Sequence, residues 1–132
     1  MRIIRAGSQP SQEAPGEWFT GRVRMDQPIA TEAPARLADV VVTFEPGART
    51  NWHTHPRGQT LLVLSGLGRA GREGEAPQEI RPGDLVWFPP GERHWHGAAP
   101  GCAMSHLALH EADEAGRTVT WAEPVSDADY GA

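Results

Sequence analysis

Short strand-like stretches separated by proline- and glycine-containing turns constrain the fold of this 132-residue chain more than any other feature. Four turn sequences punctuate the middle of the chain: Pro46-Gly47, Pro56-Arg57-Gly58, Pro82-Gly83-Asp84 and Pro89-Pro90-Gly91. Proline fixes φ and glycine supplies a positive φ, so each predicts a tight turn. Between the turns, β-branched and aromatic residues favour strands over helices. The chain is therefore predicted to be all-β.

Strands are predicted over residues 17–24, 38–45, 51–55, 59–64, 85–88, 93–98, 103–110 and 118–121. Residues 69–77 are polar and predict an exposed loop or hairpin tip. Residues 127–130, which follow Ser126, are compatible with one helical turn and equally with a frayed tail. A chain of 132 residues can bury one core, so we expect residues 1–132 to form one domain.

Charge and hydropathy exclude several classes of partner. The net charge of −5 is spread without an acidic block or a basic stripe, which argues against nucleic acid and anionic membrane surfaces. No apolar run approaches the ~20 residues of a membrane span, and the N-terminal residues lack the apolar core of a secretory signal. We expect a cytoplasmic protein with a small-molecule partner. Cys102 has no second cysteine to pair with, and we expect it to be a small core residue.

A group of metal-ligating residues surrounds the second turn. His53 and His55 lie two residues apart on a predicted strand, so their side chains leave the same face about 7 Å apart and can converge on one ion. Taken alone, the pair fits two half-exposed strand histidines equally well. The turn at 56–58 brings Gln59 back opposite His55 as a third ligand. The fourth ligand comes from a later strand, where residues 93–98 include two more same-face histidines.

The spacing of these residues resembles the cupin superfamily. A first motif spans residues 47–66: Gly47, five residues, His53-Thr54-His55, three residues, Gln59, six residues, Gly66. A second spans 83–98: Gly83, five residues, Pro89-Pro90-Gly91, two residues, His94. The resemblance implies a single-domain jelly-roll β-barrel. It also implies one divalent metal ion per chain, held by His53, His55, Gln59 and His94.

Two positions depart from the family pattern. Gln59 stands where the family usually has glutamate, and Ala98 where it usually has asparagine. Three neutral imidazoles and an amide leave the charge of the ion uncompensated, which predicts a stronger Lewis acid with affinity for anions. Relatives with this ligand set imply Mn(II), with Fe(II) or Zn(II) as the next candidates. The alternative is a degenerate cupin without metal.

The remaining cavity residues follow from strand parity. If His94 points inward, His96 does too, which makes it the first candidate for an acid or base. His106 and His110 form a second same-face series and are further catalytic candidates, although either face of that strand could be the inner one. The candidate substrate-binding residues, three apolar side chains and one hydroxyl, are Val40, Val42, Leu61 and Thr50. Trp52, Trp87 and Trp95 are expected to pack on the outer face or between subunits.

Longer segments resemble one group of small bacterial cupins, the (R)-selective hydroxynitrile lyases. They comprise residues 7–9, 18–21, 44–50, 58–60, 82–87 and 94–100. This resemblance implies a metal-dependent lyase that cleaves cyanohydrins such as mandelonitrile to an aldehyde and HCN, and catalyses the reverse addition, with His96 moving the proton. The alternatives are an iron dioxygenase and a non-catalytic small-molecule-binding cupin. Five tryptophans and free outer strands predict a homodimer or homotetramer.

Overall fold

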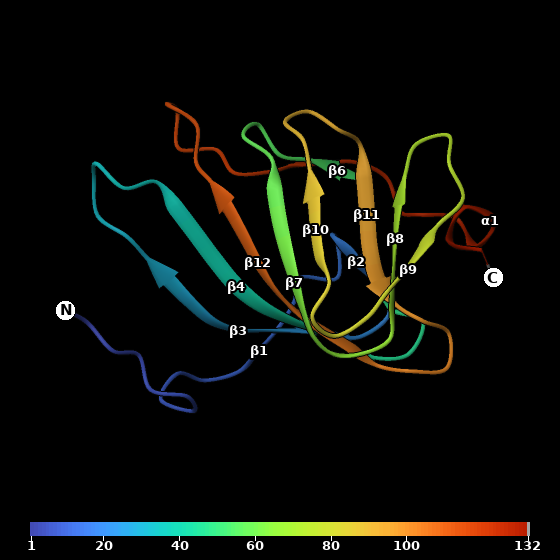
Figure 1. The fold of residues 1–132 in the computed structure, drawn as a ribbon, viewed down its shortest axis with the longest axis horizontal. Helices are drawn as coiled ribbons and strands as arrows, with labels where there is room; N and C mark the ends of the chain where they lie inside the picture. The colour runs from blue at the N-terminus through green and yellow to red at the C-terminus, as the bar shows by residue number, and fades with distance from the viewer. Residues whose placement is uncertain (132) are drawn as a thin grey trace.

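Two antiparallel β-sheets face each other in the computed structural model (Figure 1), which describes residues 1–131 apart from the side chains of Gln27 and Ala30. Within this range the first sheet has the strand order β1-β3-β4-β12-β7-β10. In that order its strands are Gln12–Glu13, Val23–Ala30, Leu37–Phe44, Met104–Glu111, Gln59–Gly66 and Leu85–Phe88. The prediction of an all-β barrel is confirmed.

The second sheet has the order β13-β6-β11-β5-β2, with β8 paired to β11 and β9 to β8. In that order its strands are Thr120–Trp121, His53–Thr54, His94–Ala98, Arg49–Thr50 and Phe19–Thr20, followed by Gly68–Arg72 (β8) and Gln78–Ile80 (β9). Strands β11 and β12 therefore belong to opposite sheets, although a single turn region joins them. This arrangement lets the histidines of both strands point into the same interior.

The prediction of a loop over residues 69–77 is wrong at its start, because Gly68–Arg72 forms β8 and pairs with β11. Glycine is a poor strand former, which hid this strand from propensity reasoning. At Gly71 a β-carbon would collide with the indole of Trp95, so the absence of a side chain allows β8 to lie against β11. The predicted strand 17–24 is also divided: β2 ends at Thr20 and β3 begins at Val23.

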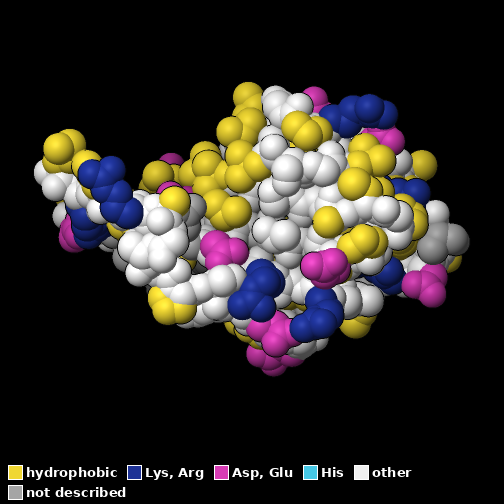
Figure 2. All heavy atoms as spheres, turned by 90° about the horizontal axis from the view of Figure 1, so that it is seen from below, with side chains coloured by type: hydrophobic (Ala, Val, Ile, Leu, Met, Phe, Trp, Pro, Cys, Tyr) yellow, Lys and Arg dark blue, Asp and Glu magenta, His cyan; other side chains and the backbone are white. Residues whose placement is uncertain are grey.

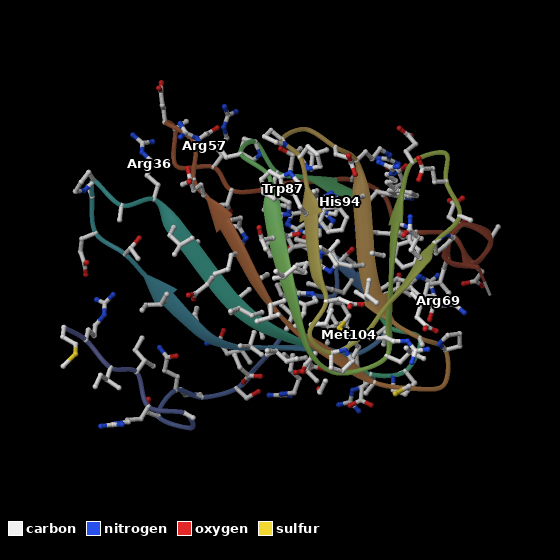
Figure 3. The ribbon with its side chains drawn as sticks, in the orientation of Figure 1. Arg36, Arg57, Arg69, Trp87, His94 and Met104 are labelled. Carbon is white, nitrogen blue, oxygen red and sulfur yellow. The ribbon has the colours of Figure 1, made fainter. Side chains whose placement is uncertain are left out.

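The hydrophobic core fills one end of the space between the sheets. Its fully buried members include Phe44, Leu61, Val63 and Met104. In Figure 3, Met104 lies near the lower ends of the strands, whereas His94 lies higher. The packed core thus closes one end of the barrel, and the polar site occupies the remainder of the interior.

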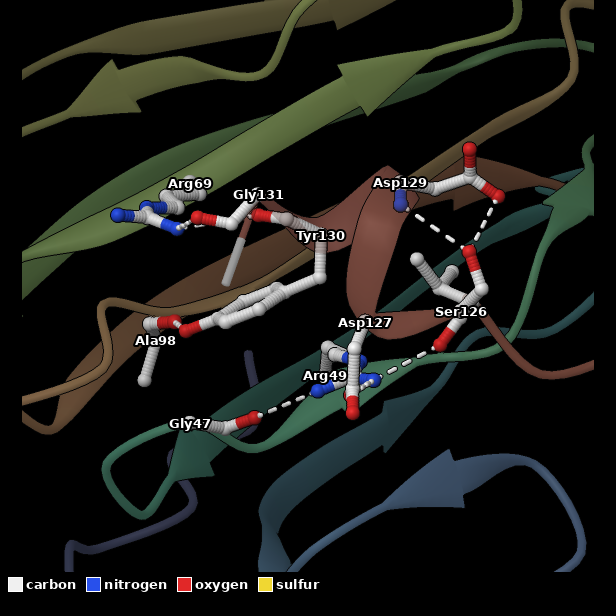
Figure 4. Close-up of polar contacts among 10 residues, drawn as sticks. Gly47, Arg49, Arg69, Ala98, Ser126, Asp127, Asp129, Tyr130 and Gly131 are labelled. Carbon is white, nitrogen blue, oxygen red and sulfur yellow. Dashed lines mark hydrogen bonds and ion pairs between the residues drawn. The ribbon is translucent and has the colours of Figure 1, made fainter.

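Residues Asp127–Tyr130 form the short helix α1, so of the two alternatives for this segment the structure has the helical turn. The hydroxyl of Ser126 caps it by accepting a hydrogen bond from the backbone N–H of Asp129. Tyr130 donates a hydrogen bond to the backbone oxygen of Ala98 at 2.6 Å (Figure 4). The guanidinium groups of Arg49 and Arg69 lie over its ring, at 4.5 and 5.0 Å from the centroid. We call residues 121–131 the C-terminal clasp.

The clasp covers the outer side of the second sheet. Trp52, Trp95, Val125 and Tyr130 form a second buried cluster there, separate from the main core. Trp52 and Trp95 thus pack on the outer face, as predicted. The clasp also reaches β6 directly, because Trp121 of β13 pairs with His53.

An apolar patch lies on the outer face of the first sheet. Leu85, Leu62, Leu107 and Val41 stand in register across β10, β7, β12 and β4. Leu85 and Trp87 are 73% and 57% exposed. Figure 2 shows hydrophobic side chains over the upper and central parts of its view, with charged groups at the upper right and along the lower edge. We call Val41, Leu62, Leu64, Leu85, Trp87 and Leu107 the outer patch.

Two smaller findings complete the fold. Cys102 is exposed and not a core residue, because it lies in the turn between β11 and β12, where its backbone forms an isolated bridge with Ala99. Within residues 1–131 no helix is long and apolar enough to cross a membrane.

Candidate metal centre and cavity

All six histidines of the chain gather in the interior between the two sheets. His53, His94 and His96 come from β6 and β11 of the second sheet, whereas His106 and His110 come from β12 of the first. His55 follows β6, and its ring lies 5.0 Å from that of His53 and 5.4 Å from that of His94. Concentration of every imidazole in one interior indicates a built site.

Three of the rings are oriented by backbone carbonyl groups. The Nδ1 atoms of His53 and His94 lie 2.9 and 2.8 Å from the carbonyl oxygens of Asn51 and Glu92. The Nδ1 atom of His55 lies 2.6 Å from the carbonyl oxygen of Thr118. A carbonyl oxygen only accepts, so Nδ1 must carry the proton in each ring. The Nε2 lone pair of each neutral ring is then free to bind a metal ion.

Burial keeps these histidines neutral. It lowers the pKa of His53 well below the ordinary value of 6.5, with nearby His94 as the next cause. Burial likewise lowers the pKa of His94 to about 3 and shifts the pKa of His55 downward. Neutral imidazole is the form that ligates metals, so at neutral pH these rings need no deprotonation before binding an ion.

Gln59 occupies the centre of the group. Its Oε1 atom lies 3.3 Å from Nε2 of His94 and 3.2 Å from Nε2 of His96. Since Nδ1 of His94 holds the proton, its Nε2 and Oε1 of Gln59 face each other as two acceptors. A cation beside both atoms would remove this repulsion. In addition, Nε2 of His55 is buried and has no hydrogen-bond partner within residues 1–131.

His53, His94 and His96 can hold one metal ion by geometry, since one ring nitrogen from each lies within 4.8 Å of the others. His55 stands just outside this tightest trio, although its ring is close to two of the members. The structure therefore brings the four predicted ligands together and adds His96 to the same group. The chemistry of this group also suits a metal ion, because every contributing side chain is a neutral donor.

His96 differs from the three carbonyl-oriented histidines. Its Nδ1 atom lies 3.0 Å from Nε2 of His106, so another imidazole holds it. Its backbone N–H donates to the hydroxyl of Thr50 at 3.2 Å. Burial lowers the pKa of His96 well below 6.5, with His106 as the next cause, and burial lowers that of His106 to about 3. Both rings are thus neutral. Because Nε2 of His96 faces the accepting amide oxygen of Gln59, that nitrogen carries the proton, and Nδ1 of His96 accepts from Nε2–H of His106.

The group opens onto a cavity of about 760 Å³. Besides five histidines and Gln59, its wall includes Val40, Val42 and Thr50, three of the candidate substrate-binding residues. Leu61 is fully buried in the core and lies outside the lining residues. The question of which face of β12 is inner is also settled: His106, Ala108 and His110 line the cavity.

Sequence reasoning missed the aromatic wall opposite β12. Trp18 and Trp121 stack at 5.4 Å, and Trp121 lies 4.7 Å from the ring of His53. Phe19 extends this wall, whereas Met25 lines the cavity from β3, in the same sheet as β12. The tryptophans come from opposite ends of the chain, so local patterns could not place them together. The side chain of Gln9 from the N-terminal segment also lines the cavity.

Known proteins resemble this chain in both sequence and structure. The chain is 58% identical over 130 residues to an (R)-mandelonitrile lyase of Granulicella tundricola, covering 98% of each chain. A solved cupin-like protein of Thermotoga maritima is 32% identical, with a TM-score of 0.82, over 98% of this chain and 95% of that one.

A more distant structure has the same fold. The polyketide cyclase RemF of Streptomyces resistomycificus has a TM-score of 0.77 at 18% identity, over 98% of this chain and 90% of the cyclase. The sequence profile of the cupin domain matches residues 40–107, which carry the first motif, the second motif and His106. Together with the two-sheet barrel and its central histidines, these matches show that the chain belongs to the cupin family.

Proposed function

We propose that this protein is a metal-dependent hydroxynitrile lyase that cleaves cyanohydrins of the mandelonitrile type to an aldehyde and HCN, and catalyses the reverse addition. The 58% identity over nearly the whole length to a protein named (R)-mandelonitrile lyase is the observation that carries this proposal. The cavity supports it with a cluster of neutral donors beside a pair of linked imidazoles.

We propose His53, His55, Gln59 and His94 as the ligands. The carbonyl contacts of the three histidines support this choice, because they aim the Nε2 lone pairs away from the backbone. The buried, unpartnered Nε2 of His55 also favours it over the trio that contains His96. Imidazole and amide donors suit first-row divalent ions, and we propose Mn(II), with Fe(II) and Zn(II) as alternatives. When bound, the ion supplies Lewis acidity next to the substrate hydroxyl.

His96 acts as the base in this proposal. Its low pKa leaves the ring neutral at pH 7, so it can accept the hydroxyl proton of the cyanohydrin. The electron pair of the O–H bond forms the carbonyl bond, and the carbon–carbon bond to the nitrile breaks. Cyanide leaves with the electron pair of the broken carbon–carbon bond and receives the proton from His96. His106 steadies the charged ring through the hydrogen bond at Nδ1.

Cavity composition supports a neutral substrate. No lysine or arginine is among its lining residues within 1–131, so a substrate carboxylate would find no side-chain cation there. The wall made by Trp18, Phe19 and Trp121 supplies apolar and aromatic surface for an aryl group. His110 and Thr50 offer polar contacts next to the ligands. We propose these two and Val40 and Val42 as substrate-binding residues; Leu61 is not among them, because it packs in the core behind the cavity wall.

The decisive experiment follows benzaldehyde release from mandelonitrile. Metal-stripped protein is compared with protein reloaded with manganese, iron or zinc, and oxygen uptake is recorded in parallel. Metal-dependent benzaldehyde without oxygen uptake is the expected result. A fully loaded protein that releases no benzaldehyde contradicts the lyase; oxygen uptake would then identify the dioxygenase, and its absence the binding protein.

We also propose a homodimer or homotetramer. The outer patch supports it, because it places exposed leucines and Trp87 on neighbouring strands. β10 is, in addition, the last strand of its sheet within residues 1–131, so its outer backbone groups are free to meet a second chain.

A further inference from the structure

The amide oxygen of Gln9 is a buried acceptor without a partner. The Nε2 atom of Gln9 donates to the backbone oxygen of Pro28 at 3.4 Å. Oε1 then has no hydrogen-bond partner within residues 1–131 and is buried. An unsatisfied buried acceptor is unfavourable unless a donor reaches it from elsewhere.

The surroundings of Gln9 supply few donors. Pro10 and Pro28, which line the cavity beside it, have no backbone N–H. Met25 and Val40 of the adjacent strands line the same cavity with apolar side chains. No donor of residues 1–131 reaches Oε1, so the cavity is the side from which one can approach, and a hydroxyl group is a simple neutral donor that can do so.

The sheet register shows how far the strand that holds Pro28, the partner of Gln9, lies from the strand of the ligand Gln59. Gln59 pairs with His110, His110 with Ala38, and Ala38 with residue 30 of β3, two residues from Pro28. Three inter-strand steps separate β3 from β7, which corresponds to at most roughly 14 Å. A metal–oxygen bond and a hydrogen bond account for about 5 Å of this distance. The remaining length suits an elongated substrate with its donor at the far end.

We infer that Gln9 forms a polar subsite that accepts a hydrogen bond from the para hydroxyl of an aryl cyanohydrin. The inference rests on the proposed lyase function and narrows its substrate class to cyanohydrins of para-hydroxylated aryl aldehydes. The hydroxyl donates to Oε1 of Gln9, while the ring lies between the apolar strands β3 and β4 and the aromatic wall. A para-methyl analogue has a similar shape but no donor, and leaves Oε1 unpaired.

The test compares 4-hydroxymandelonitrile with 4-methylmandelonitrile. We expect kcat/KM for the hydroxylated substrate, divided by kcat/KM for the methylated one, to be about tenfold lower in Gln9→Met than in wild type. This replacement keeps the side-chain length but removes the amide acceptor. Intrinsic differences between the substrates cancel, because only the change in ratio between variants is used. Gln12→Met is the matched control, since Gln12 lines the mouth of the cavity but is exposed. An unchanged ratio in Gln9→Met overturns the inference.

A binding measurement separates this inference from the lyase proposal. Calorimetry with the product aldehydes needs no turnover: 4-hydroxybenzaldehyde is expected to bind wild type about tenfold tighter than 4-methylbenzaldehyde, and Gln9→Met to bind both equally. If mandelonitrile is not cleaved but this binding preference exists and depends on Gln9, the lyase proposal fails and the subsite stands. If mandelonitrile is cleaved but Gln9→Met keeps the wild-type preference, the subsite alone fails.

Discussion

Nε2 of His106 lies 3.0 Å from Nδ1 of His96, and this hydrogen bond joins the two sheets across the interior. The carbonyl-oriented histidines have one permitted neutral tautomer, because a carbonyl oxygen cannot donate. An imidazole partner can donate or accept, so the hydrogen bond between His96 and His106 can be kept, with its direction reversed, when Nδ1 of His96 takes up a proton. This freedom suits a group that takes up and returns a proton, and it distinguishes His96 from the proposed ligands.

His96→Ala is expected to reduce turnover of mandelonitrile by about 10²- to 10⁴-fold, the usual contribution of general acid–base catalysis. The metal content per chain should remain unchanged, because His96 is not among the proposed ligands. Kinetics and elemental analysis of the same preparation test both statements. Loss of metal from this variant would instead identify the trio of His53, His94 and His96 as the ligand set.

His55→Ala is expected to weaken metal binding more than the roughly 10- to 100-fold that loss of an outer-shell partner costs. The reason is the loss of a ligand nitrogen that has no other partner. Competition with a chelator measures the affinity. His110→Ala is the control, since the ring of His110 stacks on His55 at 5.2 Å and should not bind the ion. Equal affinity of the two variants would remove His55 from the ligand set.

Metal-free protein is expected to lose stability as the pH falls below 6.5. The pKa of His106 is lowered to about 3 by burial, so between these values the unfolded chain binds a proton that the folded chain does not. Its contribution is fully present above pH 6.5 and declines by about 1.4 kcal/mol per pH unit toward pH 3. Urea unfolding of wild type and His106→Phe across this range measures it. A pH dependence as steep in His106→Phe as in wild type would disprove the assignment.

Replacement of both Leu85 and Trp87 by lysine is expected to convert the proposed oligomer to a monomer of 14.3 kDa. The two lysine ammonium groups would lie at the exposed centre of the outer patch, and burying them between subunits would cost their hydration free energy. Light scattering after size exclusion gives the mass. Leu37→Lys is the control, because Leu37 is also exposed but lies outside the patch. The proposal is contradicted by a monomeric wild type or by an oligomer that survives the double replacement.

Tyr130→Phe is expected to lower the free energy of unfolding by about 1–3 kcal/mol, because the buried carbonyl of Ala98 loses its donor. Tyr130→Ala should cost more, since the ring between the two arginines is lost as well. Urea denaturation gives both values. If Tyr130→Phe is as stable as wild type, the hydroxyl contributes nothing to the attachment of the clasp.

Local sequence patterns predicted the elements that carry their own signals. The Pro-Gly turns and the alternation around His53 and His94 placed the proposed ligands on strands that do meet. His106 and His110 could not be assigned to a face, because leucines at 107 and 109 made both faces of the strand look apolar. Only pairing of β12 between β4 and β7 decides which face meets the second sheet.

Contacts between distant segments escaped prediction for a different reason. Strand β8 is glycine-rich, and it forms because it pairs with β11, where the indole of Trp95 packs against Gly71. The residues of β8 alone do not indicate this pairing. Stacking of Trp18 on Trp121 depends on strands from the two ends of the chain. The unpartnered oxygen of Gln9 likewise depends on where the N-terminal segment lies against Pro28 of β3. Such features depend on closure of the barrel.

Confinement of every imidazole to one interior makes the protein its own spectroscopic probe. All histidine ring signals in a proton or nitrogen NMR spectrum of the untagged chain come from this one interior, because the sequence has no other histidine. Titration of a paramagnetic or diamagnetic ion would therefore be read ring by ring without site-directed labels. A polyhistidine tag would remove this property, and the choice of purification handle thus determines whether the site can be observed directly.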